Sequence, residues 1–290
     1  MKEYIGSFRL RTLPLSIAGI IIGSCYAYQQ LHLFSVAVFV LALCTTLSLQ
    51  ILSNLSNELG DALKGTDNEN RSGPHRGLQL GLITKKGLQK MIIVFIVLSL
   101  LFGLLLIHAA FGTFFSMQAI VMALLGLCAI VASIKYTLGK GAYGYMGLGD
   151  LAVFLFFGLL STAGAFYLQS QQLLTSVFLL GSVIGLLSVG VLNVNNVRDM
   201  ENDKACGKQT FAARIGMNGA KIYHVLLILA AFVGLYLLEC YAAFYLTPLF
   251  LLHLYWMLTK KGKELDKQLP FLSISTLLLT LVCSIELLLH

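Results

Sequence analysis

Long apolar stretches separated by short polar segments run along the whole chain. Each stretch approaches or exceeds the roughly 20 helical residues that cross a hydrocarbon core of about 30 Å. The pattern predicts an all-α, polytopic membrane protein with one transmembrane domain over residues 1–290. The nine predicted spans are Leu13–Tyr28, Leu33–Ser56, Met91–Ala110, Thr113–Ile134, Leu148–Leu168, Leu173–Val194, Ile222–Leu238, Tyr241–Leu258 and Leu269–Leu289.

Composition agrees with this pattern. Hydrophobic residues make up 58% of the chain, charged residues 11%, and the mean hydropathy is +0.84. These values lie far outside the range of a soluble globular domain of this length. The first apolar stretch lacks a small-residue cleavage site and precedes further spans, so we interpret it as a retained helix.

The basic residues indicate how the chain crosses the membrane. All 20 lysines and arginines fall in the N-terminal segment or in the connections after spans 2, 4, 6 and 8. By the positive-inside rule, this partition predicts an N-terminus inside and a C-terminus outside. The net charge of +7 is therefore a topology signal and predicts no nucleic-acid partner. We expect a multi-pass protein of the cytoplasmic (inner) membrane with its chemistry facing the cytoplasm.

Cysteine and histidine offer no metal motif. The six cysteines show no metal-type pairing, and no histidine has a metal partner at helical spacing. We interpret the cysteines as small apolar packing residues. Tyr143 and Tyr145 are interpreted as aromatic residues of the membrane interface.

A first polar cluster follows the second span, in the segment NELGDALKGTDNENR from Asn57 to Arg71. Asn57 and Asp61 stand four residues apart and share one helical face. Gly65 and Thr66 are suited to end the helix, so that the loop can fold Asp67 back toward the same place. This arrangement predicts oxygen ligands around a divalent cation.

A second cluster lies at the end of span 6, in NVNNVRDMENDKACGKQT from Asn193 to Thr210. Asn196, Asp199 and Asp203 are spaced three and four apart, which places them on one helical face. Helix caps use the same residue types, but capping does not explain carboxylates repeated on one face twice beside a membrane, where ionisable groups are costly.

Two carboxylate-bearing helix ends that face each other across a cavity suit a Mg²⁺-bridged diphosphate. Mg²⁺ prefers carboxylate, amide and water oxygens together with phosphate oxygens. The same ligands leave Mn²⁺ open as an alternative. Nearby cations suited to the remaining phosphate charge are Lys64, Arg71, Arg198, Lys204 and Lys208.

These segments resemble the UbiA superfamily of intramembrane prenyltransferases, in its 1,4-dihydroxy-2-naphthoate polyprenyltransferase branch. The resemblance rests on R-L-R-T-L-P, N-x-x-x-D-x-x-K-G-T-D, R-x-G-P-x-R-G, Y-G-Y-x-G-L-G-D and N-N-x-R-D-x-x-x-D-x-x-x-G-K-x-T, which occur in order along most of the chain. The sequence departs from the pattern at Glu58, where Asp is common, at His75, where an apolar residue is usual, and at Gln209, where Arg is frequent. No departure removes a carboxylate.

The resemblance implies nine helices around a central cavity that opens to the cytoplasmic side. It implies transfer of a chain from a polyprenyl diphosphate to 1,4-dihydroxy-2-naphthoate, with loss of CO₂, to give a demethylmenaquinone. Mg²⁺ is assigned to Asn57, Asp61, Asp67, Asn196, Asp199 and Asp203, of which Asp61, Asp199 and Asp203 are the catalytic carboxylates. The substrates are assigned to Lys64, Arg71, Arg198, Lys204, Tyr136, Lys135 and Arg11, with Tyr136 and Lys135 at the rim of the pocket.

The sequence alone leaves other functions open. Another member of the superfamily would use 4-hydroxybenzoate, haem or a chlorophyllide as acceptor. A secondary transporter would also carry polar residues between helices, but it would need them near mid-span and accessible from both faces. A non-catalytic membrane scaffold is a third alternative. The residues do not indicate the length of the isoprenoid chain or the oligomeric state.

Overall fold

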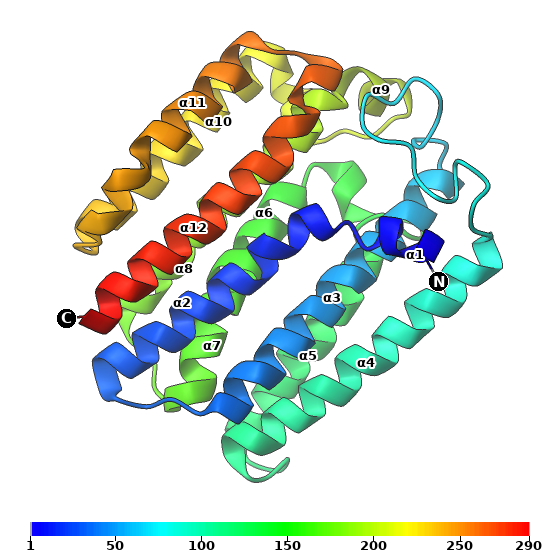
Figure 1. Cartoon of the computed structure of the whole chain (residues 1–290). Coiled ribbons are helices and arrows are strands. Elements are labelled where there is room, and N and C mark those ends of the chain that lie inside the picture. Colours follow the sequence, from blue (N-terminus) through cyan, green and yellow to red (C-terminus); the bar gives the residue numbers. More distant parts are fainter. Residues whose placement is uncertain (1, 290) are drawn as a thin grey trace.

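The computed structural model describes residues 2–289, and this part of the chain is helical with connecting loops (Figure 1). It contains nine helical segments long and apolar enough to span a membrane, at Tyr4–Leu31, Val36–Leu63, Lys85–Phe111, Met117–Lys135, Gly149–Ser170, Thr175–Arg198, Phe211–Leu237, Tyr241–Thr259 and Gly262–Leu289. The predicted number and order of spans in this region are thus confirmed.

Several spans are composed of more than one helical element. The long helices are α2 (Leu13–Leu31), α3 (Val36–Leu63), α4 (Lys85–Phe111), α5 (Met117–Lys135), α8 (Thr175–Arg198), α10 (Phe211–Leu237), α11 (Thr247–Thr259) and α12 (Gln268–Leu289). The fifth span, called span 5 below, joins α6 (Gly149–Val153), the π-helical η3 (Phe154–Leu160) and α7 (Ser161–Ser170). Short elements are α1 (Lys2–Ser7), η1 (Leu10–Thr12), η2 (Tyr143–Met146), α9 (Met200–Ala205), η4 (Tyr241–Leu246) and η5 (Gly262–Lys267).

Two helices begin earlier than hydropathy alone predicts, because a threonine caps each of them. The Thr84 hydroxyl accepts a hydrogen bond from Gly87 N at 3.0 Å, so α4 starts with its polar lysine turn. The Thr210 hydroxyl accepts from Ala213 N at 3.1 Å at the start of α10, which is kinked at Gly216. Such capping satisfies the free N–H groups of the first turn.

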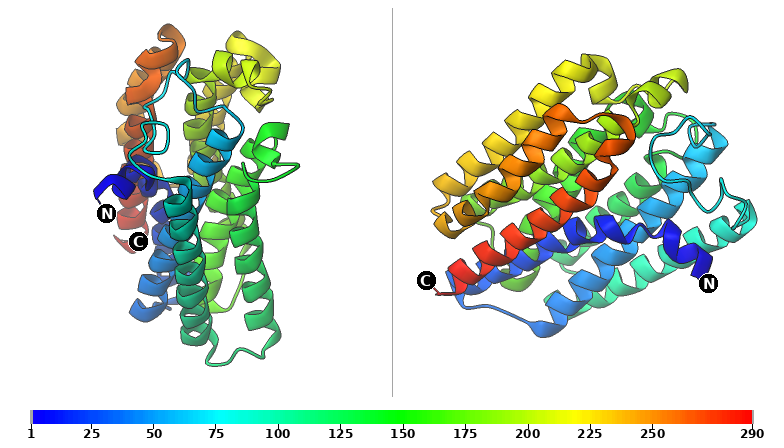
Figure 2. Two further views of the ribbon diagram at one scale, coloured as in Figure 1. Left: turned by 90° about the vertical axis from the view of Figure 1, so that its right-hand side faces the viewer. Right: turned by 45° about the horizontal axis from the view of Figure 1, so that its top comes forward.

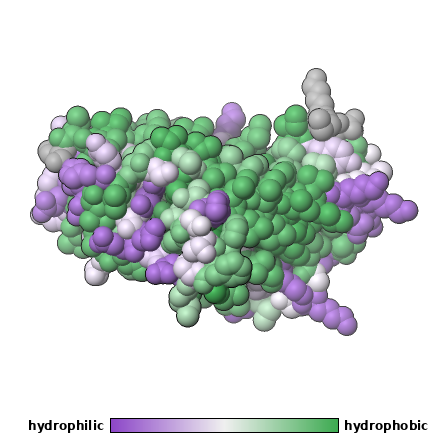
Figure 3. All heavy atoms as spheres, turned by 90° about the horizontal axis from the view of Figure 1, so that it is seen from below, coloured by the Kyte–Doolittle hydropathy of each residue, from purple (hydrophilic) through white to green (hydrophobic). Residues whose placement is uncertain are grey.

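The loops at the two ends of the bundle differ in character (Figures 1 and 2). One end, called the polar end below, carries the long segment 64–84 and the connections 136–148, 199–210 and 260–261. The connections at the opposite end are short. On the face that Figure 3 shows, the surface is largely apolar, and most of the hydrophilic residues lie toward the two sides of the view. Such a surface is suited to lipid.

The helices after span 5 form a closely packed group around α8, whose apolar residues are largely buried. Polar atoms inside this group pair with one another. His224 Nε2 lies 2.9 Å from His253 Nε2, and His253 Nδ1 lies 3.0 Å from Gln268 Oε1. Both histidines are fully buried, so they serve the packing of α10, α11 and α12.

The helices before α8 surround a cavity of about 940 Å³ instead of packing against one another throughout. Its wall is formed chiefly by α2, α3, α4, α5 and span 5, and its polar end reaches the last turns of α3 and α8. The cavity thus connects the two polar clusters predicted from the sequence with a long apolar interior.

Candidate active site

The first cluster lies on the last turns of α3. Gly65, with a φ of 74°, ends the helix in a left-handed conformation that glycine adopts without strain. The chain then folds back, and the amides of Thr66 and Asp67 donate to Asp61 O at 2.9 and 3.4 Å. The predicted return of Asp67 toward Asp61 is confirmed.

A close approach behind this helix end sets the width of the site. A Cβ atom on Gly60 would lie only 2.4 Å from Thr137 Oγ1. The Thr137 hydroxyl donates to Ser56 O at 3.0 Å and lies 3.3 Å from Asn57 Oδ1. The segment after α5 is therefore fixed directly against α3, and it places Tyr136 at the cavity wall.

The second cluster lies where α8 gives way to α9. The helix ends at Arg198, Asp199 has φ −98° and ψ 8°, and α9 restarts at Met200. The helical direction is nevertheless kept, since Asp203 N donates to Asp199 O at 2.8 Å. Asn196, Asp199 and Asp203 all line the cavity, as the spacing predicts, although across a break between two helices.

Two cations join the clusters. Lys208 Nζ lies 3.7 Å from Asp61 Oδ1 and 3.7 Å from Asp203 Oδ1. Arg71 lies 3.1 Å from Asp67 and 3.5 Å from Asp199. Two helix ends that are about 140 residues apart in the sequence therefore meet through shared basic side chains.

The segment 64–84 packs over both clusters. Gly73 N donates to Asp199 Oδ1 at 3.0 Å, and Asn202 Nδ2 donates to Thr66 O at 2.8 Å. On the other side, Leu78 N donates to Glu58 Oε1 at 2.9 Å. Glu58 is 1% exposed, so the longer arm that distinguishes it from aspartate serves to hold this segment.

Each cluster has one arginine shared between a carboxylate on the cavity and a second carboxylate behind it. Arg76 lies 3.2 Å from both Asp61 and Asp67. Arg198 lies 2.7 Å from Asp199 and 2.7 Å from Asp266 of η5. Such sharing compensates charges that would be costly to bury alone.

Asp266 also holds the N-terminal segment. Its Oδ1 atom accepts hydrogen bonds from Arg11 Nη1 at 3.0 Å and from Arg198 Nη1 at 2.7 Å. Arg11 lines the cavity, whereas the Arg198 side chain is fully buried behind it. The connection before α12 thus contributes a residue to the site that the sequence clusters do not indicate.

The carboxylates outside the spans differ in acidity. Burial raises the pKa of Asp203 to about 6, and the charges of Asp199 and Asp61 add to this effect while Lys208 opposes it. Burial also acts on Asp199, but the hydrogen bonds and charge of Arg198 hold the pKa of Asp199 below its usual range. Burial raises the pKa of Asp67 despite Arg76 and Arg71.

The predicted site residues fall into two groups. Those that line the cavity are Asn57, Asp61, Asn196, Asp199, Asp203, Arg71, Tyr136 and Arg11. Those that do not are Asp67 and Arg198, which are buried behind the wall, and Lys64, Lys135 and Lys204, which are exposed. Lys64 lies instead over the Tyr145 ring, 3.9 Å from its centroid.

Tyr145 has a different position from the one predicted. Its hydroxyl donates to Asp61 Oδ1 at 2.9 Å and lies 2.6 Å from Thr66 Oγ1, so it belongs to the first cluster and not to an interfacial belt. Burial, and then the charge of Asp61, raise the pKa of Tyr145, which keeps the hydroxyl protonated. The Y-G-Y motif carried the only sequence signal for this role.

Two arginines were missed as site residues. Arg9 and Arg76 both line the cavity, and Arg76 is the second arginine of the R-x-G-P-x-R-G segment. Arg9 has a positive φ of 50° and stands just before η1. Its Nη2 atom is buried without a hydrogen-bond partner, which leaves a donor at the cavity.

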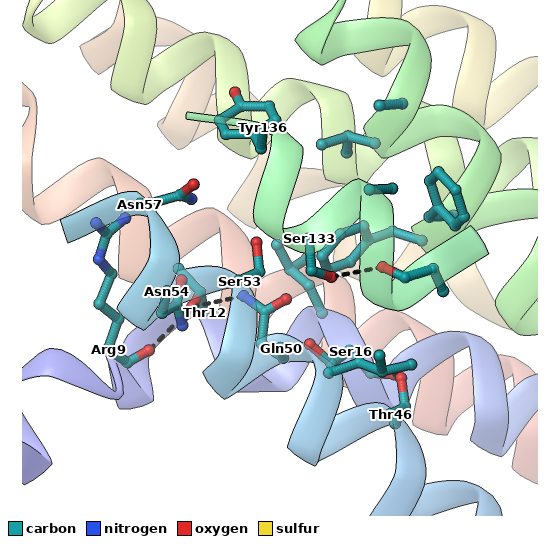
Figure 4. Close-up of a pocket in the computed structure, with 18 of the residues that line it drawn as sticks. Arg9, Thr12, Ser16, Thr46, Gln50, Ser53, Asn54, Asn57, Ser133 and Tyr136 are labelled. Carbon is teal, nitrogen blue, oxygen red and sulfur yellow. Dashed lines mark hydrogen bonds between the residues drawn. The ribbon is translucent and has the colours of Figure 1, made fainter. Parts of the chain in front are cut away.

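A polar strip continues from the clusters into the cavity (Figure 4). Gln50 Nε2 donates to Thr12 Oγ1 at 3.1 Å, and Asn54 Nδ2 donates to Phe8 O at 2.8 Å. Only 8% of Gln50 is exposed, and its Oε1 atom is buried without a hydrogen-bond partner. Ser133 and Tyr136 face this strip from the α5 side (Figure 4). Beyond it the wall is largely apolar, with scattered hydroxyl side chains such as those of Ser16, Thr46 and Ser99.

The carboxylates are bound by basic side chains and are not grouped around a common point. Across residues 2–289, no three histidine, cysteine, aspartate or glutamate side chains are placed together so as to hold a metal ion. The donor set is nevertheless of the oxygen type that Mg²⁺ requires, and Asp203 Oδ2 is buried without a hydrogen-bond partner. These residues therefore fit a magnesium ion once cations move from the carboxylates to a phosphate ligand.

Known proteins are similar to this chain in sequence and in fold. The model of the UbiA prenyltransferase family matches residues 16–277. A 1,4-dihydroxy-2-naphthoate octaprenyltransferase of Escherichia coli (strain K12) is 42% identical over 255 residues, which cover 88% of this chain and 79% of the relative. The enzyme of the same description in Haemophilus influenzae is 42% identical over 84% of this chain and 77% of the relative.

Solved structures of low sequence identity share the fold. The apo structure of a UbiA homolog from Aeropyrum pernix K1 has a TM-score of 0.72 and 13% identity, covering 96% of this chain and 98% of that one. A UbiA homolog from Archaeoglobus fulgidus bound to GPP and Mg²⁺ has a TM-score of 0.60 and 16% identity, covering 98% of this chain and all of that one.

Proposed function

The chain belongs to the UbiA prenyltransferase family, and we propose that it transfers a polyprenyl group from polyprenyl diphosphate to 1,4-dihydroxy-2-naphthoate in menaquinone biosynthesis. The observation that carries this proposal is the meeting of carboxylates from α3 and from the α8–α9 junction at one cavity. The naming of relatives with 42% identity supports the naphthoate acceptor.

The diphosphate binds at the polar end of the cavity. Mg²⁺, which is bound together with a prenyl diphosphate in the A. fulgidus homolog, would be held by Asn57, Asp61, Asn196, Asp199 and Asp203. The ion would stabilise the negative charge of the departing diphosphate. Asp67 lies behind the wall and supports the metal ligands indirectly, because it binds Arg71 and Arg76, which face the cavity.

The chain's own cations bind the phosphate oxygens. Arg71, Arg76 and Lys208 line the cavity and each contacts a carboxylate there. With a diphosphate and its metal bound, the carboxylates would hold the metal and these cations would bind the phosphate oxygens. Both sets of charges stay compensated throughout, which a buried site requires.

The reaction then needs an ionised allylic group, a nearby ring and no water. The bond between the first prenyl carbon and the diphosphate oxygen breaks, and a carbon–carbon bond forms at the ring carbon that carries the carboxylate. CO₂ leaves, and its bonding electrons restore the aromatic ring, which gives the quinol form of demethylmenaquinone. The apolar part of the cavity keeps water from the allylic cation.

The orientation in the membrane is part of the proposal. The polar end carries the loops that hold lysine and arginine, and the positive-inside rule then places it at the cytoplasmic face of the inner membrane. The N-terminus is inside, the C-terminus is outside, and the diphosphate enters from the cytoplasm.

An assay in purified membranes tests this function. The reaction contains 1,4-dihydroxy-2-naphthoate, a polyprenyl diphosphate and Mg²⁺, and the prenylated product is identified by its mass. The proposal expects product with the naphthoate, little or none with 4-hydroxybenzoate, and loss of product with EDTA. Transfer to 4-hydroxybenzoate alone would assign the chain to another branch of the family.

A further inference from the structure

A chain of hydrogen bonds runs through the interior of the helices after span 5. It begins at Asn193 of α8, continues through His224 of α10 and His253 of α11, and ends at Gln268, the first residue of α12. We call these four side chains the polar chain. None of the four lines the cavity, and each is at most 5% exposed. Their helices lie on the side of the bundle away from α4 (Figure 1).

A backbone carbonyl fixes the direction of the hydrogen bonds in the polar chain. Asn193 Nδ2 donates to Ala220 O at 3.0 Å and lies 3.3 Å from His224 Nδ1. Because a carbonyl oxygen only accepts, the amide nitrogen of Asn193 faces Ala220 and gives its second N–H to His224 Nδ1. His224 therefore carries its proton on Nε2 and donates to His253 Nε2 at 2.9 Å. His253 in turn carries its proton on Nδ1 and donates to Gln268 Oε1 at 3.0 Å.

Both ends of the polar chain lie near the second cluster. Asn193 precedes Arg198 by five residues on α8, and Gln268 follows Asp266 of η5 by two. Asp266 Oδ1 accepts a hydrogen bond from Arg198 Nη1 at 2.7 Å. This ion pair joins α8 to the segment before α12, and the polar chain joins the same two helices by way of α10 and α11. The polar contacts thus form a closed circuit through the four helices.

The ion pair in turn orients a carboxylate of the cavity. Arg198 donates to both carboxylate oxygens of Asp199, from Nε to Oδ1 at 3.0 Å and from Nη2 to Oδ2 at 2.7 Å. Such a bidentate contact fixes the plane of the carboxylate as well as its distance. Because the Arg198 side chain is fully buried, the direction of its fork depends on the partners that hold it, of which Asp266 lies on another element.

Packing alone does not require polar side chains at this depth. The residues around the polar chain form an apolar core, in which a polar group costs free energy unless it is hydrogen-bonded. Even here one atom, Asn193 Oδ1, is buried without a partner. Leucine or phenylalanine would fill the same space without that cost. A connected polar network instead specifies one arrangement of the helices that it joins.

We infer that His224 and His253 are positioning residues for the second cluster. They hold the ends of α8 and α12 in the register at which Asp266 binds Arg198, and this ion pair orients Asp199 toward the cavity. The inference rests on the proposed function, which supplies the metal and the diphosphate that Asp199 meets there. Breaking the polar chain keeps every cavity carboxylate in place in the sequence but loosens the orientation of one of them.

The test measures, by calorimetry, how a non-reactive geranyl thiolodiphosphate binds to the purified protein with Mg²⁺. His253→Phe keeps a ring but breaks the polar chain. His253→Asn keeps an N–H donor near the position of Nδ1, and with it the link to Gln268. Phe250→Leu is the matched control, since Phe250 lies three residues earlier on α11, is 1% exposed and belongs to the apolar core.

We expect His253→Phe to raise the Kd of the analogue about tenfold, as loss of a residue that orients metal ligands does. His253→Asn should bring the Kd back to within about threefold of the wild-type value, because the hydrogen bond to Gln268 remains. Phe250→Leu should destabilise the fold through lost packing but keep the Kd within about twofold. An unchanged Kd in His253→Phe, or an equal rise in Phe250→Leu, would overturn the inference.

Nitrogen NMR of the histidine-labelled wild-type protein gives a second readout, which needs no variant to fold. The two rings are recognised by slow exchange of their N–H protons with solvent, since both are fully buried. The polar chain predicts one ring protonated only on Nε2, for His224, and one only on Nδ1, for His253. Two rings of the same tautomer, or a doubly protonated ring, would contradict the polar chain.

The proposed function fails by a different result. If the wild-type protein does not bind the analogue in the presence of Mg²⁺, the diphosphate site itself is wrong. If the wild-type protein binds it and the histidine variants bind it equally well, only the positioning role is wrong.

Discussion

The two acidic clusters have the same residue types but are held in different ways. In the first, Asp61 is held by Arg76 and Tyr145, which come from loops that follow α3 and α5. In the second, Asp199 is held by Arg198 of the same helix end, and that arginine is anchored by Asp266 next to α12. Asp61 is thus held by loop residues alone, whereas Asp199 has a partner in the helical framework in addition to Gly73 and Arg71 of the segment 64–84.

Arg76 and Arg198 each bind a second carboxylate as well, and these two second carboxylates differ in how exposed they are. The Asp67 side chain, which shares Arg76 with Asp61, is 1% exposed, and the Asp266 side chain, which shares Arg198 with Asp199, is 33% exposed. An ion pair in water contributes little, and a buried one that loses a partner leaves a costly charge. The two clusters should therefore respond unequally to matching substitutions.

Removing a cavity carboxylate should have the largest effect on turnover. Asp61→Asn and Asp199→Asn keep the volume of the side chain but remove a charge that binds the metal. We expect transfer to fall about a hundredfold or more in each variant, while the protein stays folded and membrane-inserted. Glu69→Gln, at an exposed position of the segment 64–84, is the control. Activity retained in both aspartate variants would contradict the assignment of the metal site.

Removing the second carboxylate bound by each arginine should lower the stability of the folded protein by different amounts in the two clusters. Asp67→Asn leaves two buried arginines with less compensation, and we expect a loss of about 3–5 kcal/mol in the free energy of unfolding. Asp266→Asn removes a partly exposed partner while Arg198 keeps Asp199, and a loss of about 1 kcal/mol or less is expected. Thermal unfolding in detergent measures both, with Glu264→Gln of η5 as the exposed control. A larger loss of stability in Asp266→Asn than in Asp67→Asn would contradict this prediction.

Tyr145→Phe should weaken the first cluster alone. The substitution removes the hydroxyl that donates to Asp61 Oδ1, and Lys64 can still lie over the ring. A hydrogen bond to a charged group contributes about 1.5–3 kcal/mol, so we expect the Mg²⁺ concentration for half-maximal activity to rise about tenfold or more. Tyr255→Phe, at an exposed position of α11, serves as the control. An unchanged Mg²⁺ requirement would exclude Tyr145 from the site.

The second cluster should give a pH dependence centred near pH 6. Because burial raises the pKa of Asp203 to about 6, this carboxylate is protonated below pH 6 and charged above it. Mg²⁺ binds the charged form, so its affinity should fall as the pH falls through about 6. The stabilisation by Mg²⁺ and a thiolodiphosphate analogue is measured from pH 5 to 8. Asp203→Asn should remove this dependence, and a dependence that persists in the variant would assign it to another group.

The spans and both clusters could be predicted because they depend on local patterns. Apolar length determines the helices, and spacing on a helix placed Asn57, Asp61, Asn196, Asp199 and Asp203 on the cavity. The fold-back of Asp67 was also predictable, because Gly65 provides the turn.

Residues fixed by tertiary structure could not be predicted in the same way. Lys64 and Lys204 are close to the cluster carboxylates in sequence, yet both are exposed and neither lines the cavity, because Lys64 caps the end of α3 and Lys204 lies on the exposed side of α9. Asp266 is far from both clusters in the sequence and reaches them only because η5 packs against α8. Arg9 was overlooked because it stands outside any carboxylate motif. A helical sequence pattern predicts which residues are neighbours along one helix, but it does not predict which residues of other helices they contact.

A diphosphate site shared by the two clusters is tested most directly by measuring, with calorimetry, how a non-reactive geranyl thiolodiphosphate binds to the purified protein. We predict that binding requires Mg²⁺ and weakens at least about tenfold in both Asp61→Asn and Asp199→Asn, because the ligand binds through both clusters at once. Binding of equal strength in EDTA, or in either variant, would contradict a diphosphate site shared by the two helix ends.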